Sequence, residues 1–290
     1  MRESEIIALI RERIAAAGDD AAVLPFRDTN LVLTTDMLHR RTDFPAGASP
    51  YVIGWRAVAV SLSDLAAMGA RPLGVLLALG DPDLESGLVN GILHGAIACC
   101  ASTGTALVGG DTDRHQELTL VSSAVGEAAR PVRRRGARVG DAVCVTGDLG
   151  RTQAALRLYA AGDLAAADEL FAFSPRVEWG LRLAPYATSM IDISDGLAHS
   201  LHILAQESGV GFEIDEPLLP VSTAATQGIP RAELREAILF GGEDYELLFT
   251  VPKEAIAAIP PTVRFSVIGN VTEAGVRANG HALPDTGYEH

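Results

Sequence analysis

Hydrophobic positions in the first half of the chain alternate between helical and strand-like spacing. Apolar residues at helical spacing predict an amphipathic helix over residues 3–16. Two short apolar runs then flank a polar turn at residues 27–30, a pattern typical of a β-hairpin. Residues 37–50 are polar and are expected to be irregular. Beyond them the pattern predicts helices over residues 51–69 and 84–103, a buried strand over 73–79, and strands over 106–108 and 117–125.

The composition changes over residues 127–141, where arginine, alanine and glycine dominate, and this stretch is the best candidate for a linker. Beyond it, Asn279-Gly280 predicts a terminal hairpin. The other predicted strands lie at residues 141–146, 190–193, 212–214, 245–251 and 265–268, and the predicted helices at 150–161, 175–184, 196–208, 231–239 and 253–259. Strands and helices that alternate in both halves predict a mixed α/β (α+β) fold with two domains, residues 1–132 and 133–290.

Charge and cysteine content restrict the function classes. Acidic residues outnumber basic ones by 37 to 23, for a net charge of −14, which argues against a nucleic-acid surface and favours recruitment of divalent cations. The cysteines Cys99, Cys100 and Cys144 lie in apolar stretches and are expected to be buried, reduced thiols. The sequence shows no signal-peptide pattern and no apolar run of the ~18 residues that a membrane helix requires. We expect a cytoplasmic protein without nucleic-acid or membrane partners.

One carboxylate stands out because its surroundings are apolar. The segment from Val60 to Ala70 is small, hydrophobic and helix-forming, yet it contains Asp64. An isolated ionised aspartate in such surroundings costs several kcal/mol unless it is paired, hydrogen-bonded or bound to metal. Asp64 could be a local helix cap, or it could face a site that other parts of the chain complete.

Other acidic residues lie in similar short motifs, mostly where an apolar strand gives way to glycine, serine or threonine. Each alone is more often a turn former or a helix cap than a metal ligand. In the predicted hairpin, however, the start of one strand adjoins the end of the other, so Asp19 and Asp20 should lie near Asp36. The set comprises Asp19, Asp20, Asp36, Asp64, Asp111, Asp192, Asp195, Glu243 and Asp244.

Carboxylates that converge repel one another unless cations share them, and oxygen ligands favour Mg²⁺ or Ca²⁺ over zinc. Protein-bound Mg²⁺ usually completes its shell with substrate phosphates. The turn Gly147–Gly150, between a predicted strand and helix, can also bind phosphate, although it lacks the lysine of a P-loop. The residues thus indicate a Mg-nucleotide enzyme without a P-loop.

Taken together, the motifs resemble the thiamine-monophosphate kinase family, which shares a superfamily with aminoimidazole ribonucleotide synthetase. They span nearly the whole chain in the family's order. The matching segments are Gly18-Asp-Asp-Ala-Ala22, Thr34-Thr-Asp36, Leu62-Ser-Asp-Leu-Ala-Ala-Met-Gly-Ala70, Gly109-Gly-Asp-Thr112, Ile191-Asp-Ile-Ser-Asp-Gly-Leu197 and Gly241-Gly-Glu-Asp-Tyr-Glu-Leu247.

The resemblance implies an N-terminal domain that binds ATP and Mg²⁺ and dimerises through its sheet, and a C-terminal α/β domain that closes over the nucleotide. It implies that ATP phosphorylates thiamine monophosphate directly, with several Mg²⁺ ions, in a homodimer. The implied metal ligands are Asp20, Thr34, Thr35, Asp36, Asp64, Asp111, Asp192 and Asp195. The implied ATP contacts are Gly110, Asp111, Arg134 and Ser194, and the implied thiamine contact is Glu243.

The implied reaction needs no catalytic base. A phosphate monoester has a second pKa of about 6, so the attacking phosphate is mostly ionised at neutral pH. What remains is to neutralise and position two polyanions. We therefore assign no residue as catalytic acid or base and expect the aspartates to support the reaction through metal ions.

Two segments depart from the family pattern at the thiamine end. Many members have Gly-x-His-Phe after the Thr-Asp motif, whereas this chain has Arg41-Thr-Asp43-Phe44. Asp43 could pair with the cationic thiazolium, His39 or the adjacent arginines could take over the contact, or the segment could be a solvated loop. Near the C-terminus Asp285 replaces an aromatic residue, which leaves Tyr288 as the nearest ring.

Two other function classes stay open. The same scaffold carries ATP-dependent synthetases that activate an amide or formyl group, and it could serve as a catalytically silent Mg-nucleotide binding module. Selenophosphate synthetase is disfavoured because the first cysteine is Cys99, and the hydrogenase maturation factor because the C-terminus has no cysteine. Substrate turnover separates these classes.

Overall fold

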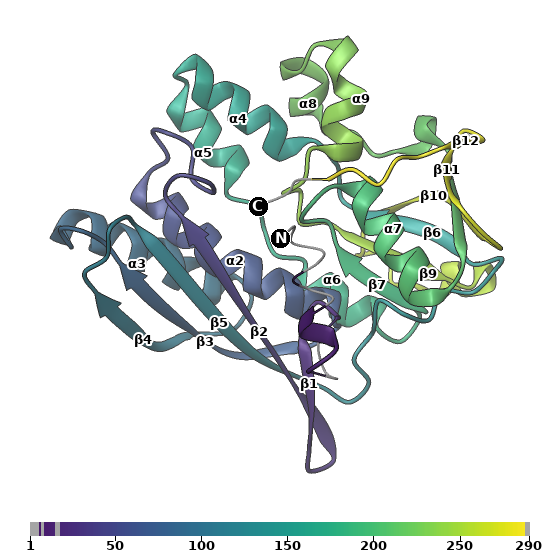
Figure 1. Ribbon diagram of the computed structural model, residues 1–290, viewed down its shortest axis with the longest axis horizontal. Coiled ribbons are helices and arrows are strands. Elements are labelled where there is room, and N and C mark those ends of the chain that lie inside the picture. The colour runs from purple at the N-terminus through teal and green to yellow at the C-terminus, as the bar shows by residue number, and fades with distance from the viewer. Residues whose placement is uncertain (1–5, 7–8, 15–17, 288–290) are drawn as a thin grey trace.

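The computed structural model describes residues 6, 9–14 and 18–287. A five-stranded and a seven-stranded sheet form its frame, with helices packed around and between them (Figure 1). This arrangement confirms the mixed α/β fold. The helix predicted over residues 3–16 lies partly outside the described residues, and of those described, residues 6 and 9–11 are helical.

The first sheet is formed by residues 22–128. Its strands are β1 (Ala22–Phe26), β2 (Thr29–His39), β3 (Arg71–Gly80), β4 (Leu107–Asp113) and β5 (Thr119–Ala128), in the spatial order β1-β2-β5-β3-β4. The predicted hairpin is confirmed, because β1 and β2 pair antiparallel with Ala22 opposite Leu33. Residues 37–39, expected to be irregular, belong to β2 because they pair with residues 119–121 of β5.

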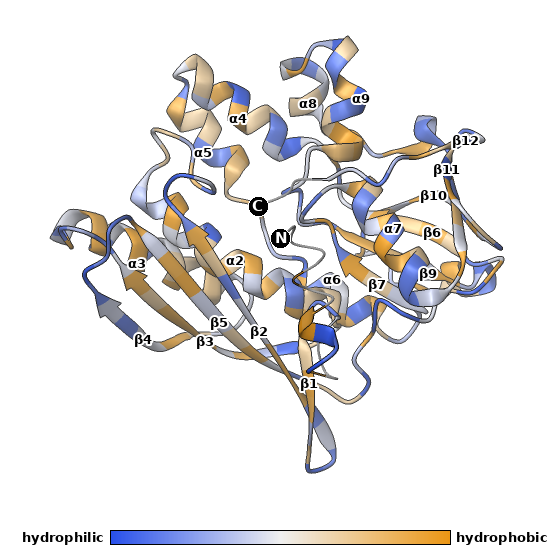
Figure 2. Ribbon diagram, in the orientation of Figure 1, coloured by the Kyte–Doolittle hydropathy of each residue, from blue (hydrophilic) through white to orange (hydrophobic). Residues whose placement is uncertain are grey.

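Helices α2 (Pro50–Ala67) and α3 (Ser86–Ser102) pack together on one face of this sheet (Figure 1). The strand predicted as buried over residues 73–79 is buried on that side only, since strand side chains alternate between faces. On the other side Leu73 and Leu76 are 47% and 48% exposed. Figure 2 shows hydrophobic residues along β2, β3 and β5. We call this uncovered side the open face of the first sheet.

Helix α2 is the central helix of the molecule. Ser49 caps its N-terminus by accepting a hydrogen bond from Val52 N over 3.3 Å. A Cβ atom on Gly95 of α3 would lie 1.8 Å from Tyr51 O, and one on Gly54 of α2 would lie 1.9 Å from the α3 backbone. The two helices therefore pack backbone against backbone, which only glycine permits at these positions.

The second sheet lies beyond the linker. Its strands are β6 (Ala142–Thr146), β7 (Ser189–Asp192), β8 (Gly211–Ile214), β9 (Leu247–Val251), β10 (Phe265–Thr272), β11 (Val276–Ala278) and β12 (His281–Ala282), in the order β12-β11-β8-β10-β6-β9-β7. Pairing of β11 with β12 confirms the hairpin predicted at Asn279-Gly280. The α-helices of this half are α4 (Arg151–Ala161), α5 (Leu164–Phe171), α6 (Val177–Leu183), α7 (Leu197–Ser208), α8 (Thr223–Gly228) and α9 (Arg231–Phe240).

Short elements account for the differences from the predicted pattern. The α-helix predicted over residues 253–259 was wrong in type: Lys253–Ala258 is a 3₁₀-helix, confined between Pro252 and Pro260. Helices α5 and α8 were not predicted. Helix α5 is separated from α4 by Gly162, whose φ of +83° reverses the chain, and Asp163 then caps it. A second 3₁₀-helix, η1, covers Glu216–Leu218.

The chain passes between the sheets through residues 129–141, within the stretch predicted as a linker. One hydrophobic core extends across this passage, because Val58 and Leu62 of α2 belong to the same cluster as Met190 and Phe249 of the second sheet. The two halves are thus joined by packing as well as by the chain. Within the described ranges, no helix combines the length and the apolar character needed to cross a membrane.

Candidate active site in an acidic cavity

A cavity of about 970 Å³ lies where the two halves meet. Segments from β2, α2, the loop after β7 and the loop before β9 form its walls. Its acidic residues are Asp19, Asp20, Asp36, Asp43, Asp64, Asp192, Asp195 and Glu243, and its arginines are Arg11, Arg41 and Arg134. Among the described residues, neither histidine nor lysine lines it. The cavity is therefore strongly acidic and offers mostly oxygen ligands.

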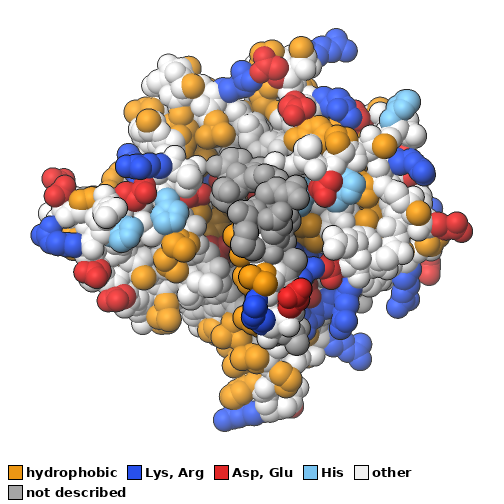
Figure 3. Space-filling model, in the orientation of Figure 1, with side chains coloured by type: hydrophobic (Ala, Val, Ile, Leu, Met, Phe, Trp, Pro, Cys, Tyr) orange, Lys and Arg blue, Asp and Glu red, His pale blue; other side chains and the backbone are white. Residues whose placement is uncertain are grey.

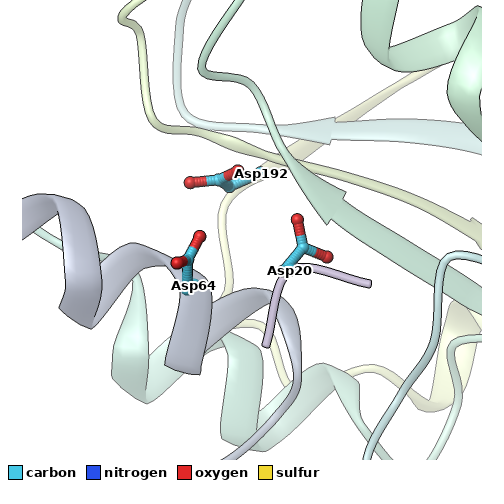
Figure 4. A group of neighbouring side chains, drawn as sticks. All are labelled: Asp20, Asp64 and Asp192. Atoms are coloured by element: carbon cyan, nitrogen blue, oxygen red, sulfur yellow. The ribbon is translucent and has the colours of Figure 1, made fainter. Parts of the chain in front are cut away.

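Three carboxylates from distant parts of the sequence converge in this cavity. Asp20 precedes β1, Asp64 lies in the last turn of α2, and Asp192 ends β7. One oxygen of each lies within 4.8 Å of the other two, and Figure 4 shows the carboxylates pointing toward one another. Asp64 is thus a member of a shared site rather than an isolated cap.

Strand β2 adds two polar side chains to this cluster. Thr34 and Asp36 project from the same side of the strand because side chains alternate. The Thr34 hydroxyl donates a hydrogen bond to Asp64 Oδ2, and Ser61 Oγ donates to Asp36 Oδ2 over 2.5 Å. The convergence of Asp20 with Asp36, expected from the hairpin, is confirmed by their places in the same cavity.

Further hydrogen bonds tie the cluster together. Ser63 Oγ donates to Asp192 Oδ2 over 2.6 Å, and Arg134 donates to Asp20 Oδ1 from Nη2 over 2.9 Å. The backbone N of Arg134 donates to Asp19 over 2.8 Å. Within the described part of the chain, the buried Oδ2 atom of Asp20 has no hydrogen-bond partner. An unpartnered buried carboxylate oxygen is costly, so this atom fits a ligand of a bound cation.

Burial and mutual repulsion disfavour the charged form of these carboxylates. Burial raises the pKa values of Asp20 and Asp36, although Arg134 opposes the effect on Asp20. Asp64 is shifted well above the usual aspartate pKa, first by burial and then by the charges of Asp36 and Asp192. Burial, followed by the charge of Asp20, raises the pKa of Asp192 to about 8. A divalent cation would relieve this repulsion, and hard oxygen ligands suit Mg²⁺.

Two loops bring further predicted residues to the cavity wall. Ser194 and Asp195 follow β7, and Glu243 lies in the loop before β9. The backbone N of Glu243 donates a hydrogen bond to Ser194 O, which joins the two loops. Asp192, Ser194, Asp195 and Glu243 are therefore brought together, as the sequence motifs suggested.

Asp43 also lines the cavity, but its carboxylate stabilises its own turn. Asp43 Oδ2 accepts hydrogen bonds from His39 N over 2.7 Å and from the Thr42 hydroxyl over 2.6 Å. The neighbouring Arg41 side chain is 84% exposed. A substrate contact by Asp43 would use its other oxygen, and such a contact stays a prediction.

Thr35 lines the cavity, but its hydroxyl points away from the acidic cluster. The Thr35 hydroxyl contacts Ser123 Oγ over 3.0 Å, on the opposite side of β2, so the Thr34 hydroxyl alone joins Asp64. Tyr288 lies outside the described residues. Asp285 pairs with His199 Nδ1 of helix α7 over 2.8 Å.

Gly110 and Asp111 lie on the edge strand β4 and do not line the cavity. Residues directly opposite each other on paired strands project to the same side. Asp111 shares such a row with Ala78, Val121 and Met37. Since Met37 adjoins Asp36 on β2 and projects to the other side, Asp111 lies on the open face, away from its own chain's acidic cluster.

The turn Gly147–Gly150 was considered as a phosphate site, but the chain fills it with its own carboxylate. Asp244 Oδ1 and Oδ2 accept hydrogen bonds from Gly150 N over 3.0 and 2.9 Å at the N-terminus of α4. Burial raises the pKa of Asp244 to about 7, although these backbone donors oppose the shift. Asp244 is therefore a helix cap, and the Gly147–Gly150 prediction is corrected.

The sequence reading missed three polar residues of this region, namely Ser61, Ser63 and Arg56. The serines orient Asp36 and Asp192. Their alternation with leucine just before Asp64 was the available signal, since it marks a polar edge on an apolar helix. Arg56 donates a hydrogen bond to Glu243 Oε1 over 2.9 Å.

Comparisons with known proteins agree with this geometry. Residues 18–128 match the family described as AIR synthase related protein, N-terminal domain, and residues 138–279 match AIR synthase related protein, C-terminal domain. The thiamine-monophosphate kinase of Halobacterium salinarum is 45% identical, with 100% of both chains covered. That of Methanospirillum hungatei is 43% identical over 100% of this chain and 99% of its own.

Solved structures give the same result. The structure described as "AaThiL complexed with AMPPCP and TMP" has a TM-score of 0.93 at 34% identity, over 100% of this chain and 97% of that chain. Thiamine-monophosphate kinase from Stenotrophomonas maltophilia K279a has a TM-score of 0.83 at 35% identity, over 96% of each chain. The chain therefore belongs to the AIR synthase-related family and, within it, to the thiamine-monophosphate kinases.

Proposed function

We propose that this protein transfers the γ-phosphoryl group of ATP to the phosphate of thiamine monophosphate and forms thiamine diphosphate. The observation that carries the proposal is the convergence of Asp20, Asp36, Asp64 and Asp192 in one cavity shared by both halves. Membership of the thiamine-monophosphate kinase family supports the choice of substrates.

The acidic cluster fits several Mg²⁺ ions. Its donors are oxygens, their charged forms are destabilised without a cation, and one buried oxygen of Asp20 lacks a partner among the described residues. Bound Mg²⁺ would neutralise the phosphates of both substrates and stabilise the charge of the transferring group. Asp20, Thr34, Asp36, Asp64 and Asp192 would hold these ions, with Asp195 at the rim.

The chain's own side chains complete the positioning of the two polyanions. Arg134, fixed by Asp20, is the cation nearest the cluster and would bind ATP phosphate, with Ser194 beside it. Glu243, with Asp43 and Tyr288 as further candidates, would contact the thiamine heterocycles. The acceptor phosphate is already mostly ionised at neutral pH, so we assign no residue as catalytic base.

We further propose that two copies pair through the open face of the first sheet. Leu76, Met37 and Leu24 are 48%, 59% and 50% exposed on that face, and Figure 3 shows hydrophobic side chains gathered near β1 and β2. Contiguous exposed apolar surface of this kind favours a protein partner. Asp111 projects from the same face, so pairing would place its carboxylate at the interface between the two copies.

Substituting an apolar residue of this face tests the pairing. Leu76→Glu should convert a dimer into monomers in light scattering and reduce turnover. Leu218→Glu is the control, since Leu218 is similarly exposed at 51% but lies in the second half. A monomeric wild type, or an unchanged dimer in Leu76→Glu, would contradict the pairing.

The remaining proposals concern domain limits and location. The connection between the sheets supports domain limits at 1–132 and 133–290. Cys99, Cys100 and Cys144 are buried free thiols, which supports a reducing, cytoplasmic location.

The experiment that tests the function is direct. Purified protein is incubated with Mg-ATP and thiamine monophosphate, and thiamine diphosphate and ADP are measured by chromatography. Stoichiometric formation of both products supports the proposal. Absence of thiamine diphosphate, with ATP turnover on an amide or formyl acceptor instead, would refute it in favour of a synthetase, and absence of any turnover would favour a binding module.

A further inference from the structure

A buried arginine lies behind the part of the cavity wall that Glu243 forms. The side chain of Arg56, from the middle of α2, is 1% exposed. A buried guanidinium is costly unless it is paired and hydrogen-bonded. Arg56 Nη2 donates to Glu243 Oε1 over 2.9 Å, and Nη1 donates to Phe171 O over 2.8 Å. Its charge is therefore matched by the carboxylate of Glu243, a residue of the cavity wall.

Aromatic rings hold this guanidinium in place. The Arg56 Cζ atom lies 3.7 Å from the centre of the Phe171 ring, 5.2 Å from that of Phe173 and 5.5 Å from that of Tyr245. The Phe173 and Tyr245 rings are stacked, with centroids 4.2 Å apart. Cation–π contacts of this kind stabilise an arginine that is shielded from water. The arginine, which belongs to the first half of the chain, thus has one fixed orientation set by residues of the second half.

The backbone of the loop that carries Glu243 is also held in one conformation. Glu243 has φ of +60° and Tyr245 has φ of +51°, a left-handed conformation that is unfavourable for residues with side chains. The Thr152 hydroxyl donates to Glu243 O over 2.7 Å. Backbone strain at a fixed loop is typical of functional sites, so the conformation of Glu243 requires an explanation.

The Glu243 carboxylate has one oxygen occupied and one available. Oε1 accepts from Arg56, whereas Oε2 has no hydrogen-bond partner among the described residues, and the side chain is 29% exposed at the cavity wall. Arg56 and Asp64 are eight positions apart on α2, which places Asp64 about 12 Å farther along the helix. One helix therefore supports the acidic cluster in its last turn and Glu243 about two turns earlier.

We propose that Arg56 is a positioning residue that fixes Glu243 for recognition of the thiamine heterocycle. With Oε1 held by Arg56, Oε2 accepts a hydrogen bond from an N–H donor of the aminopyrimidine. Without the guanidinium, the carboxylate loses its buried partner and rotates freely at the cavity wall. This inference rests on the proposed function and names the part of the chain that selects the heterocycle.

The test separates the two substrates. KM for thiamine monophosphate and KM for ATP are measured for the wild type, Arg56→Gln, Arg56→Lys, Glu243→Gln and the Arg56→Gln/Glu243→Gln double variant. Arg56→Gln and Glu243→Gln should each raise KM for thiamine monophosphate about 10- to 100-fold, as expected for loss of a hydrogen bond to a charged group. KM for ATP should stay within about twofold of the wild type. In the double variant, KM for thiamine monophosphate should be no higher than in the more impaired single variant, because the two residues act as a unit.

Arg176→Gln is the matched control, because Arg176 forms a similar pair with the buried Glu246, and Glu246, unlike Glu243, does not line the cavity. It should lower thermal stability without changing either KM. Arg56→Lys, which keeps the charge, should lose less than Arg56→Gln, and this comparison remains informative if Arg56→Gln folds poorly.

Calorimetric binding of unphosphorylated thiamine provides a readout that does not depend on turnover. It should weaken in both single variants and stay unchanged in Arg176→Gln. Unchanged KM for thiamine monophosphate in folded Arg56 variants, or additive effects in the double variant, would overturn the inference. A wild type that forms no thiamine diphosphate would instead overturn the proposed function on which it rests.

Discussion

Ser63 Oγ donates a hydrogen bond to Asp192 Oδ2 over 2.6 Å, although the two residues lie 129 positions apart. Ser63 is on α2, which packs on the first sheet, and Asp192 ends a strand of the second. The acidic cluster is therefore assembled only when the two halves are packed together. Formation of the acidic cluster and docking of the halves are parts of the same event.

Removal of this hydrogen bond should weaken metal binding. Ser63→Ala leaves Asp192 without its orienting donor. Loss of such a partner typically reduces metal affinity about 10- to 100-fold, and we expect an effect of this size. The measurement is the Mg²⁺ concentration that gives half-maximal turnover. Ser189→Ala is the control. Ser189 is a buried serine on β7, the strand of Asp192, but its hydroxyl contacts Thr250 and not Asp192. Equal effects of both substitutions would show that Ser63 acts only through packing.

The metal-free protein should lose stability as pH rises. In the unfolded chain these carboxyl groups have the ordinary pKa of 3.8, whereas in the folded chain the pKa of Asp192 is about 8 and those of Asp20, Asp36 and Asp64 are raised. The folded state therefore binds more protons between these values, and the free energy of unfolding decreases as pH increases from about 4 to about 8. Melting temperatures in chelator near pH 6 and near pH 8 test this sign.

Mg²⁺ should reverse this trend, because it binds the deprotonated carboxylates of the folded state. The increase in melting temperature on adding Mg²⁺ should be larger near pH 8 than near pH 6. Asp192→Asn should flatten the pH dependence of the metal-free protein. A metal-free protein that becomes more stable toward pH 8 would contradict the proposed repulsion.

Replacing the central aspartate should stabilise the empty site. Asp64→Asn removes one of several buried carboxylates that repel one another, while the amide can still accept from Thr34. We expect the melting temperature in chelator to rise by about 2–4 °C, which corresponds to about 1 kcal/mol in a protein of this size. A clear decrease would instead identify Asp64 as a structural cap.

Two glycines of α3 should respond in opposite ways to alanine. A Cβ on Gly95 would lie 1.8 Å from Tyr51 O, whereas a Cβ on Gly87 would have no neighbour within 4 Å. Gly95→Ala should destabilise the protein by about 1–3 kcal/mol or more through overpacking. Gly87→Ala should be neutral or stabilising by up to about 1 kcal/mol, because alanine is the better helix former. Denaturant titration of both variants measures the difference.

The order of strands and helices could be predicted from the sequence because it is encoded in local periodicity. The turn at residues 27–30 placed Asp20 near Asp36, since a hairpin is a local structure. Asp64 could be recognised because a charge in an apolar helix is unfavourable without a partner. The role of Asp192 came from the resemblance of its motif to a family.

Contacts between distant segments could not be predicted in this way. The hydrogen bond from Ser63 to Asp192 and the ion pair of Arg56 with Glu243 depend on how the two halves dock, which leaves no periodic signal. The sequence of the turn before α4 is compatible with a phosphate site. The structure shows instead that Asp244, from the loop before β9, accepts a hydrogen bond from Gly150 N in this turn. Similarly, only the strand register shows that Asp111 lies on the open face.

The most direct test is the Mg²⁺ dependence of thiamine diphosphate formation in the wild type, Asp64→Asn and Asp141→Asn. Asp141 is the control, a buried aspartate outside the cavity that accepts from Thr188 over 2.7 Å. The wild type and Asp141→Asn should need Mg²⁺ and turn over at similar rates, whereas Asp64→Asn should fold and lose at least about 100-fold in rate. Turnover by folded Asp64→Asn at the wild-type rate, or turnover without divalent cations, would contradict a metal-assisted transfer in this cavity.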